Sequence, residues 1–257
     1  MVVVRLPRLR RRVIEGDMTF FDHLTELRNR LIISLLAVLA GAIVGWLIWN
    51  WVLHVSTQPY CDAQEARGAL VNGEAACKLY ITNPMELLTT RLSVSGYIGV
   101  FLASPVILWQ LWRFITPGLH RNEKRYAIPF VASSVLLFLL GAFVAWLTFP
   151  KALSFFLSSG GDVETLFNPT PYLKLIFLMM LISGIVFELP LLLVFLELVG
   201  VVTSRQLRSW RRYAICINFV VAAIATPSQD PYSLFAMALP MCIFYEVAIL
   251  VGRVLKK

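Results

Sequence analysis

The stretch "LIISLLAVLAGAIVGWLIWNWVL", residues 31–53, contains no charged residue and is long enough to cross a lipid bilayer as a single helix. A helix rises 1.5 Å per residue, so about 30 Å of hydrocarbon takes about 20 apolar residues. The segment just before it, "DHLTELRNRL" at 22–31, holds two acids, two arginines and a histidine. The chain therefore enters its first apolar run from a densely charged segment.

The composition of the whole chain indicates that lipid surrounds most of it. Of its 257 residues 58% are hydrophobic and only 15% are charged, with a mean hydropathy of +0.74. A soluble domain carries about 25% charged and about 45–50% apolar residues. We therefore expect an all-α membrane protein with several spans.

Five further apolar runs follow the first. The last two meet at the proline-rich "TPSQDP", which predicts a tight helical hairpin. The fifth run is short, which favours a locally thinned membrane or shelter by neighbouring helices. The five runs are 92–112, 127–150, 172–199, 213–229 and 231–252. Six transmembrane helices are thus expected in one domain, 18–252, between a basic and disordered leader (1–17) and a short basic tail (253–257).

The basic residues predict the orientation of these spans. The two terminal segments and the connections 113–125 and 200–212 hold 18 of the 23 lysines and arginines. Cytoplasmic connections carry the excess of basic residues, so both termini are expected in the cytoplasm. A nucleic-acid partner is not expected, because the charge is spread over four separate segments.

The four cysteines fall into two pairs. Cys216 and Cys242 lie inside apolar runs and are expected to pack as small hydrophobic residues. Cys61 and Cys77 lie in the non-cytoplasmic loop 54–84, where oxidation is permitted. A disulfide between them is expected, with two free thiols as the alternative.

The sequence shows no catalytic or metal-binding signature. It has no HExxH zinc motif and no nucleotide-binding loop. "SGGD" (159–162) is expected in a loop, and "LISG" (181–184) has no partner histidine within a span. We expect no enzyme, metal or cofactor. Acids inside spans are functional candidates in general, so Glu188 and Glu246 leave open a proton- or ion-coupled transporter of a small solute.

The charged segment before the first span has the pattern of an amphipathic helix. Its apolar residues fall on about a third of the helix circumference, with Glu26 nearly opposite, and Thr19 with Asp22 forms a possible capping box. We expect this helix to lie along the cytoplasmic face with Glu26 toward water. The ordinary alternative is a local ion pair between Glu26 and Arg30.

The connection 113–125 carries a single acid, Glu123, among four basic residues. Such an acid is usually a solvated neighbour of those bases. Beside Phe114 and the rigid Pro117, it can instead recognise a basic peptide, since arginine favours bidentate contacts with carboxylates.

Five motifs in order, "HLTELRNRL", "SPVILWQLWRFITPGL", "NEKR", "FELP" and "TPSQDP", closely resemble the TatC family over about residues 18–252. This family is the signal-reading subunit of the twin-arginine protein translocase. The resemblance implies a receptor for the twin-arginine signal peptides of folded substrates, in the cytoplasmic membrane of a prokaryote. It also implies a multimeric assembly with single-span partners of the TatA and TatB types, powered by the proton-motive force.

The resemblance also assigns roles to residues. It places signal-peptide binding on Glu26, Arg28, Phe114 and Glu123, and assembly or translocation on Pro59, Glu188 and Asp230. Two features depart from the family pattern. "NEKR" lacks the histidine that often precedes the acid, and Leu234 stands where some members have a polar partner-binding residue.

Overall fold

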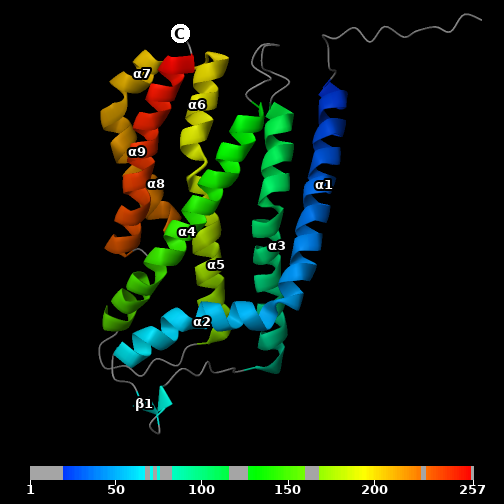
Figure 1. Cartoon of the computed structure of the whole chain (residues 1–257), viewed down its shortest axis with the longest axis vertical. Coiled ribbons are helices and arrows are strands. Elements are labelled where there is room, and N and C mark those ends of the chain that lie inside the picture. The colour runs from blue at the N-terminus through cyan, green and yellow to red at the C-terminus, as the bar shows by residue number, and fades with distance from the viewer. Residues whose placement is uncertain are drawn as a thin grey trace, which may run out of the picture.

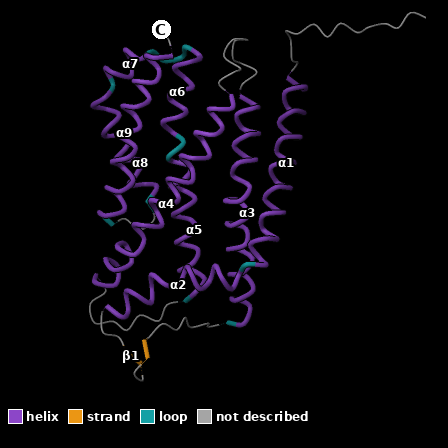
Figure 2. The backbone as a smooth tube through the Cα atoms, viewed as in Figure 1, coloured by secondary structure: helices purple, strands orange, loops and turns teal. Residues whose placement is uncertain are grey.

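The structure, a computed structural model, describes residues 20–66, 70–71, 74–75, 83–115, 127–159, 168–226 and 230–255. This part of the chain is helical apart from an antiparallel hairpin of β1 (Leu70–Val71) and β2 (Glu74–Ala75), as Figures 1 and 2 show. The all-α expectation is confirmed. The helices are α1 (Phe20–Leu47), α2 (Trp49–Ala66), α3 (Pro84–Ile115), α4 (Ala127–Ser159), α5 (Pro169–Val186), α6 (Leu189–Val199), α7 (Ser204–Ser209), α8 (Arg211–Ala225) and α9 (Pro231–Leu255).

Five stretches of the described residues are long and apolar enough to cross a membrane. The expected fifth span corresponds to α8, whose 15 residues reach only about 22 Å at 1.5 Å per residue. The six-span count therefore stays a prediction. The five stretches are His23–Leu47, Pro84–Ile115, Ile128–Phe156, Pro169–Val199 and Pro231–Arg253.

Helix α1 corrects the prediction of a separate amphipathic helix. It runs unbroken from Phe20 to Leu47, so the charged segment 22–31 is the first part of the span helix and does not turn along the membrane face (Figure 1). No glycine or proline occurs between residues 20 and 40, and a turn there would leave backbone groups unpaired beside lipid. The expected capping box lies outside the residues described in detail.

Helix α2 occupies much of the expected loop 54–84 and lies across the lower ends of other helices in Figure 1. Trp49, Val52 and Tyr60 join a buried cluster with residues of α4 and α5. The hydroxyl of Tyr172 in α5 donates to the Ser56 carbonyl over 2.9 Å. These contacts fix α2 to the bundle although it does not cross it.

Helices α1 and α3 cross at very short distance through the sequence "GAIVG", residues 41–45. A Cβ atom added to Gly41 would lie 2.8 Å from the Gly99 carbonyl oxygen. Glycines four residues apart allow two helix backbones to approach in this way.

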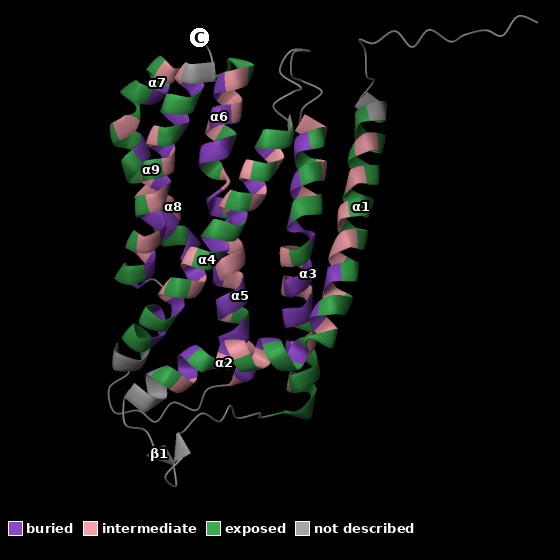
Figure 3. Cartoon of the chain, in the orientation of Figure 1, coloured by how far each residue is buried: buried purple, intermediate pink, exposed green. Residues whose placement is uncertain are grey.

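A cation–aromatic contact joins the same two helices near the end of α1. The Arg91 guanidinium of α3 stacks over the Trp46 ring of α1 at 4.1 Å and donates to the Trp46 carbonyl over 2.9 Å. Figure 3 shows buried residues along α3 and mostly exposed or intermediate ones along α1.

Helices α8 and α9 form the expected hairpin. Ala222 and Ala225 of α8 pack with Met237, Ala238 and Met241 of α9 in one buried cluster. The prediction from "TPSQDP" is therefore confirmed.

Cys61 of α2 is disulfide-bonded, and Cys216 and Cys242 carry free thiols. The expected partner, Cys77, lies outside the described residues.

We expect mass spectrometry of unreduced, alkylated protein to find a peptide linked through Cys61 and Cys77. Alkyl groups are expected on Cys216 and Cys242. Closing a loop of this size stabilises the fold by about 3 kcal/mol, so Cys61→Ser is expected to lower the unfolding temperature. Alkylation of all four thiols without reductant contradicts this prediction.

Candidate functional site

The first part of α1 is tied to the last turns of α3 through Arg30. Its guanidinium forms an ion pair with Glu26 and also donates to the Gln110 carbonyl of α3 over 3.4 Å. The Glu26 side chain is 27% exposed, so it faces the helix pair more than the expected open water. The expected local ion pair is therefore present, and it also serves the candidate site, because Arg30 connects the Glu26 carboxylate to α3. Arg28 is exposed.

A second contact joins the same two helices. The His23 ring stacks on the Phe114 ring with centroids 4.4 Å apart and an angle of 20° between the planes. Two of the expected binding residues, Glu26 and Phe114, therefore lie at the same end of the α1–α3 pair, where α1 begins and α3 ends. Glu123 lies outside the described residues, so its position relative to them stays a prediction.

The site residues predicted from the sequence do not include two residues of this surface, His23 and Gln110. The sequence pattern indicates Arg30 only as a local partner of Glu26, and not as a contact to α3. His23 precedes Glu26 by three residues and so shares its helix face, a spacing that would have indicated it. Nothing in the sequence pattern indicates Gln110, which contributes a backbone carbonyl.

Glu188 lies where the fourth apolar run breaks into two helices. Helix α5 ends at Val186 and α6 begins at Leu189, followed by Pro190, which lacks the N–H that would continue the ladder. The Ser134 hydroxyl of α4 donates to Glu188 Oε2 over 2.5 Å, and Oε1 is buried with no hydrogen-bond partner among the described residues. A half-buried carboxylate inside a span thus bonds to a neighbouring helix and retains an unused acceptor.

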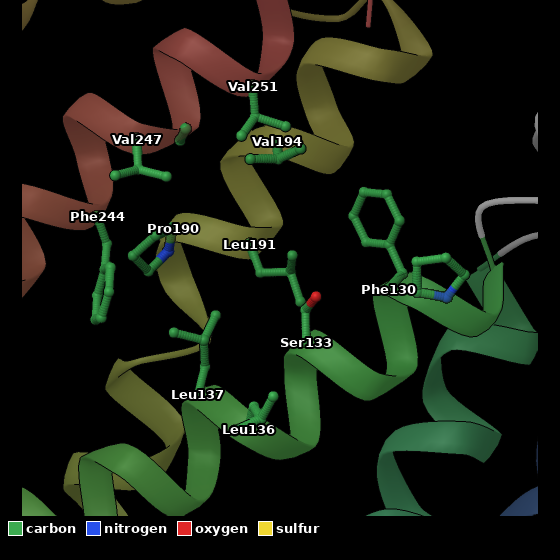
Figure 4. A pocket seen from close by; sticks show the side chains of 12 residues that line it. Phe130, Ser133, Leu136, Leu137, Pro190, Leu191, Val194, Phe244, Val247 and Val251 are labelled. Carbon is green, nitrogen blue, oxygen red and sulfur yellow. The ribbon is translucent and has the colours of Figure 1, made fainter. Parts of the chain in front are cut away.

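An apolar cavity of about 460 Å³ lies between α4, α6 and α9 (Figure 4). Its wall includes Ser133, next to the Glu188 partner Ser134, and Pro190 of the helix break. The remaining wall is almost entirely aliphatic and aromatic, which suits an apolar occupant and offers no cofactor ligand. Among the described residues no cluster of metal-ligating side chains occurs.

The other expected assembly residues have structural contacts in separate places. Pro59 is buried within α2, a helix and not the expected loop, at the end of the bundle opposite the start of α1 (Figure 1). Asp230 is fully buried and accepts a hydrogen bond from the Ser233 amide over 2.8 Å at the start of α9. The structure does not bring Pro59 or Asp230 to the surface formed by Glu26 and Phe114.

Comparison with known proteins supports the motif-based resemblance. Residues 22–240 match the family described as Sec-independent protein translocase protein (TatC). A TatC protein of Frankia casuarinae is 42% identical over 248 residues, covering 95% of this chain and 68% of the relative. One from Aquifex aeolicus is 37% identical over 243 residues, covering 92% and 95%.

A crystal structure of the twin-arginine translocase receptor TatC has a similar fold. Its TM-score is 0.71 at 36% identity, and the match covers 91% of this chain and all of that one. With the family match extending over most of the sequence, the chain belongs to the TatC family of Sec-independent protein translocases.

Proposed function

We propose that this chain is the receptor for twin-arginine signal peptides and the core subunit of a translocase that exports folded proteins under the proton-motive force. Membership of the TatC family supports the translocase role. The observation that carries the receptor role is the surface at the start of α1 and the end of α3, where Glu26 and Phe114 are held by Arg30 and His23.

This surface suits the chemistry of the signal. Two adjacent arginines need carboxylates, and a hydrogen bond to a charged group contributes about 1.5–3 kcal/mol when desolvated. Glu26 supplies one carboxylate, and Glu123 of the connection after α3 supplies the second. The apolar part of the signal can then continue along the exposed apolar side chains of α1, such as Leu31 and Leu35.

We assign six spans to this function, with α8 as the short fifth, and both termini in the cytoplasm of a prokaryote. The described basic residues support this orientation, because those of α7 and α8 lie at the same end of the bundle as the start of α1 (Figure 1). Single-span subunits of the TatA and TatB types are the proposed partners in a multimeric assembly.

Site-specific crosslinking tests the receptor role. A photoreactive side chain at Arg113, exposed at the end of α3, is expected to label a twin-arginine signal peptide strongly and its twin-lysine version weakly. Lysine is a point charge that cannot make the bidentate contact, so the contrast depends on geometry and not on net charge. Equal labelling of the two peptides contradicts the proposed role.

The transporter alternative has no support in this family. Its two candidate acids also have partners of their own, since Glu246 forms an ion pair with Arg211 across α8 and α9 and Glu188 bonds to Ser134.

Glu188 is proposed to organise the assembly through its unused acceptor. Glu188→Leu removes both the bond to Ser134 and the free acceptor, so we expect export of a twin-arginine reporter to fall severely and single-span subunits to be lost on purification. Glu188→Gln keeps the shape and a carbonyl acceptor and is expected to retain most export. Signal-peptide affinity should not change in either variant, because the hydrogen bond of Glu188 is to α4 and not to α1 or α3. Normal export by Glu188→Leu refutes this role.

His23 is expected to position Phe114 for the signal. His23→Ala removes a stacked pair worth about 0.5–1.5 kcal/mol, which corresponds to a roughly 2- to 12-fold loss of signal-peptide affinity. His23→Phe keeps an aromatic ring and should restore most of the affinity. His54→Ala, an exposed histidine of α2, is the matched control. Equal losses in the alanine and phenylalanine variants of His23 contradict a role through stacking.

A further inference from the structure

A group of cations and aromatic rings lies where α7 meets α8, and we name it the α7–α8 corner. It consists of Arg205 and Arg208 on α7, Arg212 and Tyr213 on α8, and Trp210 at the junction. All five side chains are exposed, Trp210 by 50% and Tyr213 by 71%. Arg205 and Arg208 are three residues apart and share one face of α7, and Arg212 lies in the first turn of α8, just past the junction.

The corner is held rigidly although it lies at the surface. Thr203 and Gln206 form a capping box at the start of α7. Leu207 is buried, and its carbonyl accepts a hydrogen bond of 2.7 Å from the Tyr245 hydroxyl of α9. The arginines are therefore presented from a backbone that is fixed to the bundle.

The positive charge of the corner is not neutralised within the described part of the chain. Arg211 forms an ion pair with Glu246 of α9. No described carboxylate lies within ion-pair distance of Arg205, Arg208 or Arg212. Three cations thus remain available to an external anion.

An apolar stripe continues from the corner along α8. Tyr213, Ile217, Val220 and Ile224 recur at helical spacing and are exposed by 71%, 58%, 56% and 80%. Tryptophan and tyrosine favour the headgroup level of a bilayer, and aliphatic side chains favour its interior. Because α8 is only 15 residues long, headgroups must come close to its first turn.

We propose that the α7–α8 corner binds an anionic phospholipid, with the lipid phosphate on Arg208 and Arg212 and one acyl chain along the apolar stripe of α8. Guanidinium groups bind phosphate oxygens in bidentate fashion. An anionic head with an apolar tail matches both the charge of the corner and the stripe that continues from it. An acidic protein segment matches only the charge. This inference is independent of the proposed signal-peptide site, from which it uses no residue.

The test is a titration of the purified full chain in an uncharged detergent, with thermal unfolding as the readout. The probes are short-chain phosphatidylglycerol, short-chain phosphatidylcholine, inorganic phosphate and a glutamate-rich peptide. We expect phosphatidylglycerol alone to raise the unfolding temperature of the wild type. Arg208→Gln with Arg212→Gln should weaken its apparent affinity at least about tenfold, since each lost contact involves a charged hydrogen bond. Lys151→Gln with Lys174→Gln removes the same charge from exposed positions on α4 and α5, away from the corner, and should retain the affinity.

Several results overturn the proposal. The proposed site is contradicted if the protein responds equally to the two lipids. It is also contradicted if the Arg208 and Arg212 double variant keeps its affinity for phosphatidylglycerol. An equal response to inorganic phosphate assigns the corner to a soluble anion. Stabilisation by a glutamate-rich peptide, without any difference between the lipids, assigns it to an acidic protein segment. Circular dichroism of each variant without lipid confirms that a lost response is not a lost fold.

Discussion

Replacing Gly99 by leucine is expected to abolish the binding of a twin-arginine signal peptide, although Gly99 lies far along α3 from the binding residues. A Cβ atom at this position would lie 2.5 Å from the Val38 carbonyl oxygen and 2.8 Å from the Ala42 amide nitrogen. Both are backbone atoms that cannot rotate aside, so α1 and α3 must separate. Separation removes the contacts from Arg30 to α3 and from His23 to Phe114, and with them the shape of the site. We expect affinity to fall by about 100-fold or more, because both proposed carboxylate contacts to the signal's arginines, each about 1.5–3 kcal/mol, depend on the shape of the site.

Gly96 offers a matched control on the same helix. A Cβ atom there meets nothing within 4 Å, so Gly96→Leu adds the same side chain without forcing the helices apart. Affinity is measured with a labelled signal peptide and detergent-purified protein at fixed salt, with circular dichroism to confirm helix content. Wild-type affinity in the Gly99 variant would show that the site does not depend on the crossing of α1 and α3.

Glu123→Lys is expected to abolish signal binding while leaving membrane insertion intact. The substitution removes the main carboxylate proposed for the signal's arginines and adds repulsion. Glu123→Gln keeps the shape and one acceptor and should do less damage. Glu26→Ala should weaken binding and add to the effect of Glu123→Gln, because the two acids are proposed to bind different arginines.

The same peptide titration measures these variants. Asp62→Lys is the matched charge reversal, since Asp62 is exposed on α2 at the opposite end of the bundle and should leave affinity unchanged. Tight binding of the signal by Glu123→Lys would mean that the proposed site is wrong.

The sequence predicts the elements that depend on local composition. Apolar runs locate the span helices, and "TPSQDP" locates the hairpin of α8 and α9, because lipid demands continuous apolar helices and prolines end them. Local composition misled at two places. The charges of residues 22–31 suggested a separate helix on the membrane surface. The segment contains no glycine or proline to end a helix, and it is the first part of α1. Residues 54–84 were expected to form a loop, whereas the packing of Trp49, Val52 and Tyr60 holds Pro59 within helix α2.

The candidate site is harder to predict, because its contacts join residues far apart in the chain. Glu26 and Phe114 follow from motifs, but the stacking of His23 on Phe114 and the bond from Arg30 to Gln110 depend on the crossing of α1 and α3. That crossing is set by Gly41 and Gly99, and a glycine in a span does not reveal which helix it will meet. Sequence spacing predicts which face of its helix carries a residue, but the residue that it contacts on another helix is known only from the fold.

The glycine contact between α1 and α3 also bears on the order in which the protein is made. Helix α1 packs mainly against α3, and the whole of α2 and the β-hairpin separate the two in the chain. Synthesis proceeds at about 5–20 residues per second, so α1 leaves the ribosome seconds before its partner. During that interval α1 lacks its native partner, so the small-residue face at Gly41 and Gly45 can contact any other helix that has a similar face. The first helix therefore acquires its native packing partner only after the second span helix has been made.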